Sequence, residues 1–265
     1  MNDTGKTLRL RRFTRRGGAV IIPMDHALFW EPPAALADLP ALVKLIAGTA
    51  ADGILITPGM LAHVAPVAGD LNIILRVDGT HTRLGQHRER TDLITTVEQA
   101  LAMGADMVVA NIFVGTDNED VHLAKLGRLA TECRRLGMPL LGEMIPASIL
   151  DFHYAGAKKR ASVQQVNRDI WLASRLGAEI GADVIKTQYS GDAAGFADIT
   201  RSTPAPIWIA GGPLKKKDDA AFLAMVEEAI AAGAGGVVIG RNVWQRESPR
   251  KMIADLCRLV HGPGA

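Results

Sequence analysis

Four segments of the chain repeat one pattern, in which a glycine-containing turn precedes a short run of mostly β-branched apolar residues. They begin at Thr49 (TAADGILITP), Met103 (MGADMVVANIFVG), Ile180 (IGADVIKTQYSG) and Ala232 (AGAGGVVIGRN). Each glycine can end a helix in the left-handed conformation, and each apolar run suits a strand buried on both faces. The pattern predicts helices that alternate with parallel strands.

Eight strands are expected in all, because four further apolar runs lie between the repeats. These runs are residues 19–23, 73–76, 140–145 and 207–210. Apolar residues spaced three and four apart predict amphipathic helices in the gaps. The helices are expected at residues 34–47, 93–103, 121–136, 163–180, 220–231 and 249–260.

One closed barrel accounts for this organisation. A (β/α)₈ TIM barrel has eight strands and typically needs about 250 residues, and the chain has 265 without a composition break or a long linker. The sequence therefore predicts the α/β class, with a single (β/α)₈ TIM barrel domain over residues 1–265. An open, doubly wound sheet is the alternative, because periodicity does not report closure.

Composition and charge argue against nucleic-acid-binding, disulfide-bonded and membrane-spanning classes of protein. The formal net charge of +2 gives no broad preference for nucleic acid. Cys133 and Cys257 lie in predicted helices, so reduced core thiols are expected. A secretory signal and a run of membrane-spanning length are both missing. We therefore expect a cytoplasmic protein with no nucleic-acid partner and no membrane partner.

The basic segment RLRRFTRR, residues 9–16, is the strongest local charge cluster. Such a cluster can contact RNA or an anionic membrane surface. A solvated cap of the barrel or a subunit contact is the favoured interpretation. Residues 1–16 are thus expected to form a basic N-terminal extension or cap.

The run GADVIKTQY, residues 181–189, places Lys186 at the end of a short buried strand. Desolvating an ammonium is costly, so a lysine in such a position indicates a function. A neutral amine is nucleophilic and condenses with a ketone or an aldehyde to an imine. Lys186 is therefore a candidate Schiff-base nucleophile. The alternatives are phosphate binding, or a packed side chain that reaches the rim.

Other polar residues also follow the predicted strands, at the face where (β/α)₈ enzymes carry their chemistry. Asp25 and His26 come after the first strand, and Glu143 lies in the fifth. Glycine-rich turns follow the seventh and eighth strands, where backbone N–H groups and an arginine can hold a phosphate. They predict a phosphorylated small-molecule substrate bound by Gly211, Gly212, Gly240 and Arg241.

Several separated motifs together resemble one family. They are PMDH (23–26), NIFVGTDNED (111–120), GMPLL (137–141), GADVIKTQYSGD (181–192), PAPIWIAGGP (204–213) and AGAGGVVIGRNVWQ (232–245). The chain resembles the archaeal-type class I fructose-bisphosphate aldolases, of the DeoC/LacD-like group, from about residue 17 to residue 261. It looks closer still to their relatives that make 2-amino-3,7-dideoxyheptulosonate, and to enzymes that condense aspartate semialdehyde with a triose phosphate.

The resemblance implies roles for single residues. Lys186 matches the lysine that forms the Schiff base, and Asp25 matches an aspartate near the donor hydroxyls, with His26 as its neighbour in the substrate site. No cofactor is implied beyond the covalent imine on Lys186, and no metal. A homo-oligomer is implied by the resemblance alone. The glycine-rich loops match the family's phosphate-gripping loops.

One position departs from the family. Family aldolases usually carry a YPRG-like segment at the end of strand five, in which the tyrosine is the acid/base catalyst, whereas this chain has IPAS at residues 145–148. Glu143 lies two residues earlier, on the same strand face, and is the favoured substitute. An ion pair with Lys186 or Arg76 is the alternative role for Glu143.

His153 and Tyr154, in the segment after Asp151, are the other acid/base candidates. The sequence predicts a class I aldolase, a lyase that cleaves or forms a C–C bond of a phosphorylated ketose with a dihydroxyacetone-phosphate-like donor. One alternative is a transaldolase-type C7 synthase that uses aspartate semialdehyde, whose carboxylate Arg76, Arg83 or Lys158 would bind. A non-catalytic phosphate-sensing barrel is the second alternative, because the family tyrosine is missing.

Overall fold

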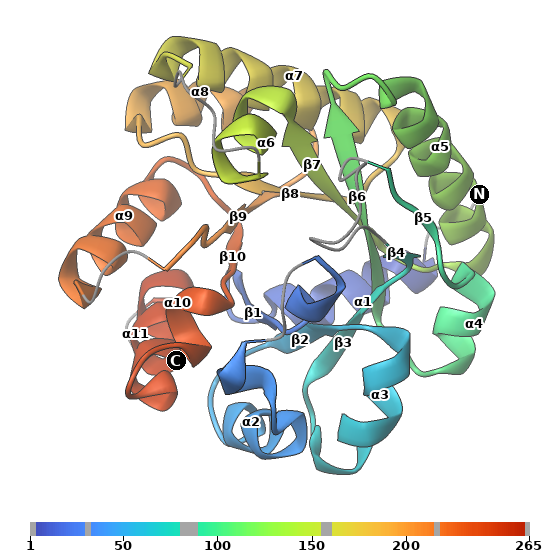
Figure 1. The fold of residues 1–265 in the computed structure, drawn as a ribbon, viewed down its shortest axis with the longest axis vertical. Helices are drawn as coiled ribbons and strands as arrows, with labels where there is room; N and C mark the ends of the chain where they lie inside the picture. Colours follow the sequence, from blue (N-terminus) through green and yellow to red (C-terminus); the bar gives the residue numbers. More distant parts are fainter. Residues whose placement is uncertain (1–3, 30–32, 80–89, 155–160, 215–217, 263–265) are drawn as a thin grey trace.

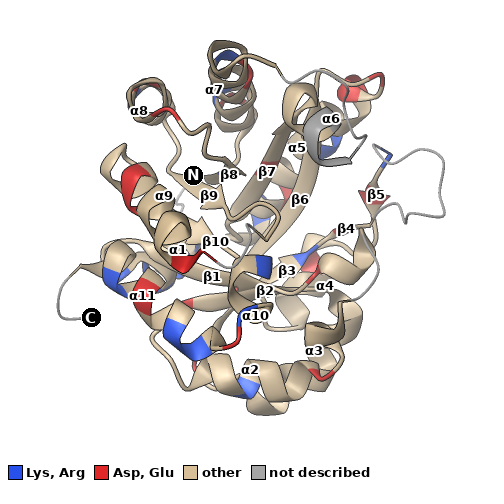
Figure 2. Ribbon diagram, turned by 60° about the vertical axis from the view of Figure 1, so that its left-hand side comes forward, with Lys and Arg blue, Asp and Glu red and all other residues tan. Residues whose placement is uncertain are grey.

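The structure is a computed structural model, and it describes residues 4–29, 33–79, 90–154, 161–214 and 218–262. Of residues 151–154 it describes the backbone alone. Figure 1 shows helices arranged around a central set of strands, and Figure 2 shows the same ribbon turned, with Lys and Arg in blue and Asp and Glu in red.

A closed barrel of parallel strands forms the centre of the described chain. Its eight strands are β1 (Ala19–Pro23), β2 (Gly53–Ile56), β3 (Asn72–Arg76), β6 (Met107–Val114), β7 (Leu140–Pro146), β8 (Val184–Gln188), β9 (Ile207–Ala210) and β10 (Gly236–Val238). Strand β10 pairs with β1, with Ala19 opposite Gly236, and this pairing closes the ring. The predicted (β/α)₈ barrel is confirmed, and the open-sheet alternative is wrong.

Helices cover the outside of this barrel (Figure 1). They are α1 (Thr4–Thr14), α2 (Leu39–Ala47), α3 (Pro58–Val64), α4 (Val97–Ala102), α5 (Glu119–Leu136), α6 (Ala147–Tyr154), α7 (Val163–Ile180), α8 (Ala193–Ser202), α9 (Asp219–Ala231), α10 (Arg241–Trp244) and α11 (Pro249–His261). Short 3₁₀ turns are η1 (His26–Leu28), η2 (Ala34–Leu36) and η3 (Ala65–Val67). Strands β4 (Asp78–Gly79) and β5 (Asp92–Leu93) pair antiparallel beside the barrel.

Local capping explains where the structure departs from the predicted helices. The helix expected over residues 34–47 is divided, because the Asp38 carboxylate accepts the N–H of Ala41 at 3.0 Å and starts α2 anew. The helix expected over residues 93–103 starts at Val97, where Thr96 and Gln99 form a capping box.

Side chains on the inner faces of the strands fill the barrel. This inner core holds Ala19, Ile21, Leu55, Ile74, Met107, Val109, Leu141, Val184, Trp208 and Val238. Phe13 of α1 belongs to the same core and is fully buried, with its ring centroid 6.0 Å from that of Trp208. Helix α1 therefore closes the end of the barrel at which the strands begin.

Polar contacts also hold α1 at this end. The Lys6 ammonium lies 2.8 Å from the carboxylate of Asp183, the residue before β8. Arg12 lies 2.6 Å from the carboxylate of Asp106, the residue before β6. Two cations of α1 thus contact residues that directly precede barrel strands.

No helix in the described part of the chain has the length and hydropathy needed to cross a membrane. Cys133 and Cys257 are buried free thiols, and burial raises the pKa of each to about 12. Both thiols therefore stay protonated and unreactive at neutral pH, as expected for core cysteines.

Candidate active site

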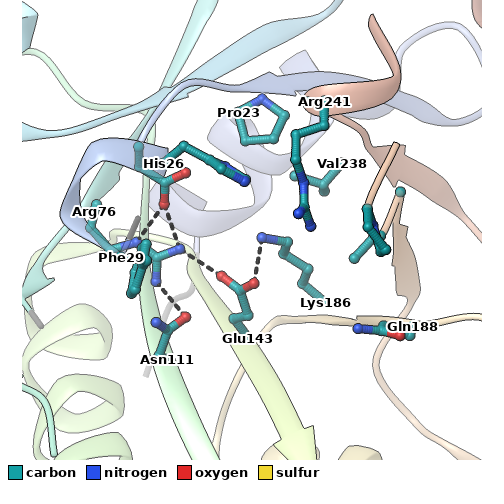
Figure 3. Close-up of a pocket in the computed structure, with 16 residues that line it drawn as sticks. Pro23, His26, Phe29, Arg76, Asn111, Glu143, Lys186, Gln188, Val238 and Arg241 are labelled. Carbon is teal, nitrogen blue, oxygen red and sulfur yellow. Dashed lines mark hydrogen bonds and ion pairs between the residues drawn. The ribbon is translucent and has the colours of Figure 1, made fainter. Parts of the chain in front are cut away.

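A cavity of about 280 Å³ opens where the barrel strands end, and Figure 3 shows it. Its walls come from nearly every part of the chain. They are formed by Pro23, Asp25, His26, Phe29, Arg76, Asn111, Glu143, Lys186, Gln188, Ala210, Gly211, Gly212, Pro213, Val238, Gly240 and Arg241. All of the predicted site residues whose side chains are described line this one cavity.

Lys186 and Glu143 face each other across neighbouring strands. The two residues are register partners in β8 and β7, so their side chains leave the sheet side by side. Lys186 Nζ lies 2.6 Å from Glu143 Oε1, and Lys186 is only 6% exposed. Strand β8 continues two residues beyond Lys186, so the lysine lies inside the cavity rather than at its rim.

The Arg76 guanidinium joins the acidic residues of the cavity (Figure 3). Its Nη2 donates to Glu143 Oε2 at 2.6 Å and lies 2.7 Å from Asp25 Oδ2, which also accepts from Nε at 2.9 Å. Its Nη1 contacts Asn111 Oδ1 at 2.9 Å and Asp78 Oδ1 at 3.2 Å. Because a guanidinium has five N–H donors, these contacts use its whole donor set. Arg76 therefore has no N–H left for a substrate carboxylate.

Glu143 stays ionised in this surrounding. Burial alone raises the pKa of its carboxyl group, but the charges and hydrogen bonds of Lys186 and Arg76 outweigh burial and lower that pKa to about 2. Arg76 is in turn almost fully buried, and its pKa is raised because three carboxylates outweigh the effect of burial. At neutral pH, Glu143 is therefore a proton acceptor and not a proton donor.

Asp25 and His26 lie just after β1, where η1 begins. Asp25 is 4% exposed and contacts Arg76, so its carboxylate is fixed at the cavity wall. Burial lowers the pKa of His26 to about 4, and Arg241 and Lys186 act in the same direction against the opposing charges of Asp25 and Glu143. His26 is thus neutral at pH 7, and it offers a ligand hydrogen bonds but no charge.

The loops after β9 and β10 form the opposite wall. Asn242 Nδ2 donates to the carbonyl oxygen of Gly211 at 2.9 Å, which ties the two loops together. Gly212 has a φ of +64°, a conformation that favours glycine. A side chain at Gly240 would come within 2.9 Å of Pro23 O, which accepts the Trp244 indole N–H. The loops can therefore present backbone N–H groups and Arg241 to an anion.

Comparisons with known proteins agree with this geometry. The model of the DeoC/LacD family aldolases matches residues 19–246. The chain belongs to this family. A 2-amino-3,7-dideoxy-D-threo-hept-6-ulosonate synthase of Halobacterium salinarum is 34% identical to this aldolase over 261 residues, which cover 98% of this chain and 93% of that protein.

Two further relatives extend the comparison. A 2-amino-4,5-dihydroxy-6-oxo-7-(phosphonooxy)heptanoate synthase of Streptomyces griseus is 32% identical over 267 residues, 98% of this chain and 91% of the relative. A solved archaeal fructose-1,6-bisphosphate aldolase is 29% identical with a TM-score of 0.85, and the match covers 98% of this chain and 100% of that one. In that structure the catalytic lysine is covalently bound to the carbinolamine intermediate of the substrate. The expected family and enzyme class, a class I Schiff-base aldolase, are confirmed.

The position at which the resemblance implies a catalytic tyrosine holds an apolar residue, Ile145. Ile145 lies two residues after Glu143 in β7, so it is on the same face of the strand, and its hydrocarbon side chain cannot exchange a proton. Tyr154 ends α6, but its side chain and that of His153 lie outside the described residues. The same holds for Arg83 and Lys158, two candidates for binding an acceptor carboxylate.

Three polar side chains of the site were not predicted: Asn111, Gln188 and the buried Lys125 behind the cavity. Asn111 and Gln188 line the cavity from β6 and β8. Gln188 follows Lys186 by two residues, so the period of a strand places it on the same face and was a usable signal. Lys125 interrupts the apolar stripe of the helix predicted over residues 121–136, which was also a signal.

Metal binding was not expected, and the described residues contain no group of three or more His, Cys, Asp or Glu side chains arranged to hold a metal ion. His81 and His87 lie outside the described residues.

Proposed function

We propose that this aldolase joins a phosphorylated three-carbon ketone to an aldehyde, and cleaves the same bond in reverse, through an imine on Lys186. One observation carries the proposal. Lys186, ion-paired with Glu143 at 2.6 Å, shares a cavity with the two glycine-containing loops and Arg241. A nucleophilic amine and an anion-binding wall in one cavity suit a substrate with both a carbonyl and a phosphate group.

The first step is attack of the Lys186 amine on the donor ketone. A lysine paired with a carboxylate must lose a proton before its nitrogen attacks, and Glu143 Oε1 is the atom placed to take that proton. The carbinolamine then loses water to give an iminium ion, which draws electrons from the neighbouring carbon. Loss of a proton from that carbon gives an enamine, and the enamine carbon attacks the acceptor aldehyde.

The new alkoxide needs a proton, and hydrolysis of the imine then releases the product and the free amine. Glu143 carries a proton only after it has received one from Lys186 or from the donor, because its resting pKa is about 2. We assign it both transfers, as acceptor first and donor afterwards, with Asp25 assisting across Arg76. Tyr154 is the competing proton donor.

The phosphate of the donor is assigned to Gly211, Gly212, Gly240 and Arg241. The two loops are linked through Asn242, and an arginine beside backbone N–H groups recognises phosphate oxygens in a charge-assisted contact. Neutral His26 contributes a hydrogen bond to the donor and no charge.

A C7 synthase that takes aspartate semialdehyde as acceptor is the second candidate. The Streptomyces relative is named for a product with a ketone at carbon 6, hydroxyls at carbons 4 and 5, and a phosphate ester at carbon 7. Cleavage between carbons 4 and 5 of such a product gives a ketotriose phosphate and a four-carbon amino acid aldehyde. The names of the relatives at 34% and 32% identity favour this acceptor over a second phosphorylated triose.

Reductive trapping tests the imine. Incubation with dihydroxyacetone phosphate and borohydride should attach the reduced donor to Lys186, because reduction turns an imine into a stable secondary amine. Lys186→Ala should give no adduct. An adduct on another lysine, or none with any ketose phosphate, would disprove the assignment.

The acceptor is tested by turnover with the same donor and two aldehydes, aspartate semialdehyde and glyceraldehyde 3-phosphate. The C7 synthase predicts a C7 amino acid phosphate with the first aldehyde and little product with the second. The opposite preference would establish a fructose-bisphosphate aldolase. The presence of Lys186, Asp25 and the glycine-containing loops in one cavity argues against a non-catalytic barrel, and a lack of turnover with every acceptor would favour such a barrel.

By resemblance to the family, we further propose a cytoplasmic homo-oligomer that needs no diffusible cofactor. Light scattering of the purified protein gives the oligomer mass, and turnover of protein freed of small molecules tests the need for a cofactor.

A further inference from the structure

Lys125 is a buried cation that the reaction outlined above does not use. It lies on the barrel-facing side of α5, within a stripe of buried residues that includes Leu126 and Leu129. It is 1% exposed, and burial lowers the pKa of its ammonium against the attraction of Asp78. Lysine is rarely fully buried unless it is paired, so its partners indicate why it is there.

The partners of Lys125 lie behind the active site. Its Nζ donates to Asp78 Oδ2 at 2.9 Å and to Thr91 Oγ1 at 2.6 Å, and the Thr91 carbonyl oxygen lies at 3.5 Å. Asp78 is fully buried, and its other oxygen accepts from Arg76 at 3.2 Å. The Asn111 backbone N–H also donates to Asp78 Oδ2 at 2.9 Å. Asp78 therefore connects Lys125 to the guanidinium that holds Glu143.

Six charges form one buried cluster that is neutral as a whole. The cations are Arg76, Lys125 and Lys186, and the anions are Asp25, Asp78 and Glu143. Without Lys125, the same contacts would leave two cations facing three anions. In a low-dielectric interior, a single unbalanced charge changes the protonation of its neighbours by a measurable amount.

We propose that Lys125 is a positioning residue for Arg76 that acts through Asp78. Its ammonium neutralises the carboxylate of Asp78, so that the guanidinium charge of Arg76 is left to stabilise the two cavity carboxylates, Asp25 and Glu143. This role rests on the proposed imine chemistry of Lys186, which lies in the same cluster.

Among the residues that the structure describes, few other charges act on the cluster. Asp92, exposed on β5, is the other acidic group that acts on Lys125. Arg241 faces the cavity from α10, and His26 is neutral at pH 7. His122 lies one turn before Lys125 on α5, where its ring packs edge-on against Phe113. None of these is altered by the variants below.

The test is the pH midpoint of imine formation, measured as the rate at which cyanoborohydride and dihydroxyacetone phosphate convert the enzyme to the reduced adduct. Lys125→Met leaves one negative charge in excess, which favours the protonated form of whichever group controls the step. The midpoint should rise by about one pH unit, the effect of a unit charge roughly 10 Å away at an effective dielectric constant near 20. Asp78→Asn should lower it by a similar amount.

The double variant Lys125→Met/Asp78→Asn removes one charge of each sign, so its midpoint should return to the wild-type value even if its rate is lower. Lys125→Arg, which keeps the charge, should also keep the midpoint. If Lys125→Met does not fold, the proposal is still tested by the shift of the midpoint in Asp78→Asn and by the cancellation of that shift in the double variant. Equal midpoints in wild type, Asp78→Asn and the double variant would overturn the proposal and leave Lys125 a structural role. A wild type that forms no adduct would instead refute the imine on Lys186.

Discussion

At the scale of single residues, the position of Glu143 between two cations decides its chemistry. Lys186 and Arg76 hold the pKa of its carboxyl group at about 2. Glu143 is therefore ionised at neutral pH, and it can donate a proton only after it has accepted one. Glu143→Gln keeps the shape but cannot carry a proton. It should slow C–C bond formation by a factor on the order of 10² to 10⁴, the usual contribution of a positioned acid/base group. Steady-state turnover and single-turnover adduct formation measure the effect.

Tyr154→Phe is the competing variant, because it removes a phenolic proton and little else. If Glu143 performs both transfers, this variant should turn over within about twofold of the wild type. A loss of turnover on the order of 10²-fold or more in Tyr154→Phe, with near-normal turnover in Glu143→Gln, would assign the proton transfer to Tyr154 instead.

Arg241 gives a second prediction at this scale. Arg241→Ala should weaken binding of dihydroxyacetone phosphate by about 1.5 to 3 kcal/mol, the range for hydrogen bonds to charged groups. Dihydroxyacetone without the phosphate should bind both proteins equally. Calorimetry of the Lys186→Ala background measures binding without reaction. Arg250→Ala is the control, since Arg250 bonds the Gly48 carbonyl far along the chain and lines no part of the cavity; equal losses in both variants would remove the phosphate assignment.

The site residues divide into those that the sequence could predict and those that it could not. Lys186, Asp25 and Glu143 were predictable because each lies within or just after a strand that hydrophobic periodicity locates. The contacts of Arg76 with Asp25 and Asn111 were not, because they join residues up to 51 positions apart and depend on barrel closure. Arg76 was expected either to pair with Glu143 or to bind an acceptor carboxylate, and the structure favours the first.

At the scale of secondary-structure elements, α1 was absent from the sequence-based helix assignments. Its mean hydropathy is low, and its many basic residues obscure the apolar pattern of Leu10 and Phe13, the two residues that pack in the inner core. Strand positions such as Ala19–Pro23 and Ile207–Ala210 were predicted to the residue, because burial on both faces gives an unbroken apolar run. Short elements such as β4 and α6 leave no comparable pattern.

Phe13 tests what α1 contributes to the fold. Phe13→Ala would open a cavity against Trp208 and should lower the free energy of unfolding by about 3 to 5 kcal/mol, the usual cost of removing a buried phenyl ring. Leu8→Ala, on the same helix but 55% exposed, should change it by less than about 1 kcal/mol. Urea unfolding followed by circular dichroism measures both. Similar small effects would show that α1 is not part of the barrel core.

At the scale of the whole molecule, the barrel places Lys186, Glu143 and the glycine-containing loops of the proposed active site at one end, and the closing helix α1 at the other. The same burial that forms the site makes the fold sensitive to acid. Glu143, with a lowered pKa, stabilises the fold above its unfolded pKa and loses that contribution as the pH falls toward 2. His26 makes stability depend on pH at higher pH values than Glu143 does, because the folded protein keeps its imidazole neutral.

The last prediction concerns His26. Its pKa is about 4 in the folded protein against 6.5 for the free side chain, so the unfolded state binds the extra proton between these values, and stability falls as the pH falls. From about pH 7.5 to about pH 5, this loss should be about 2 kcal/mol for the single group. His26→Gln, neutral at every pH, should lose about that much less than the wild type over this range in urea unfolding. The comparison isolates His26, because Asp52, whose pKa burial raises, is present in both proteins. The same slope in the wild type and in His26→Gln would show that His26 is not held neutral by the fold.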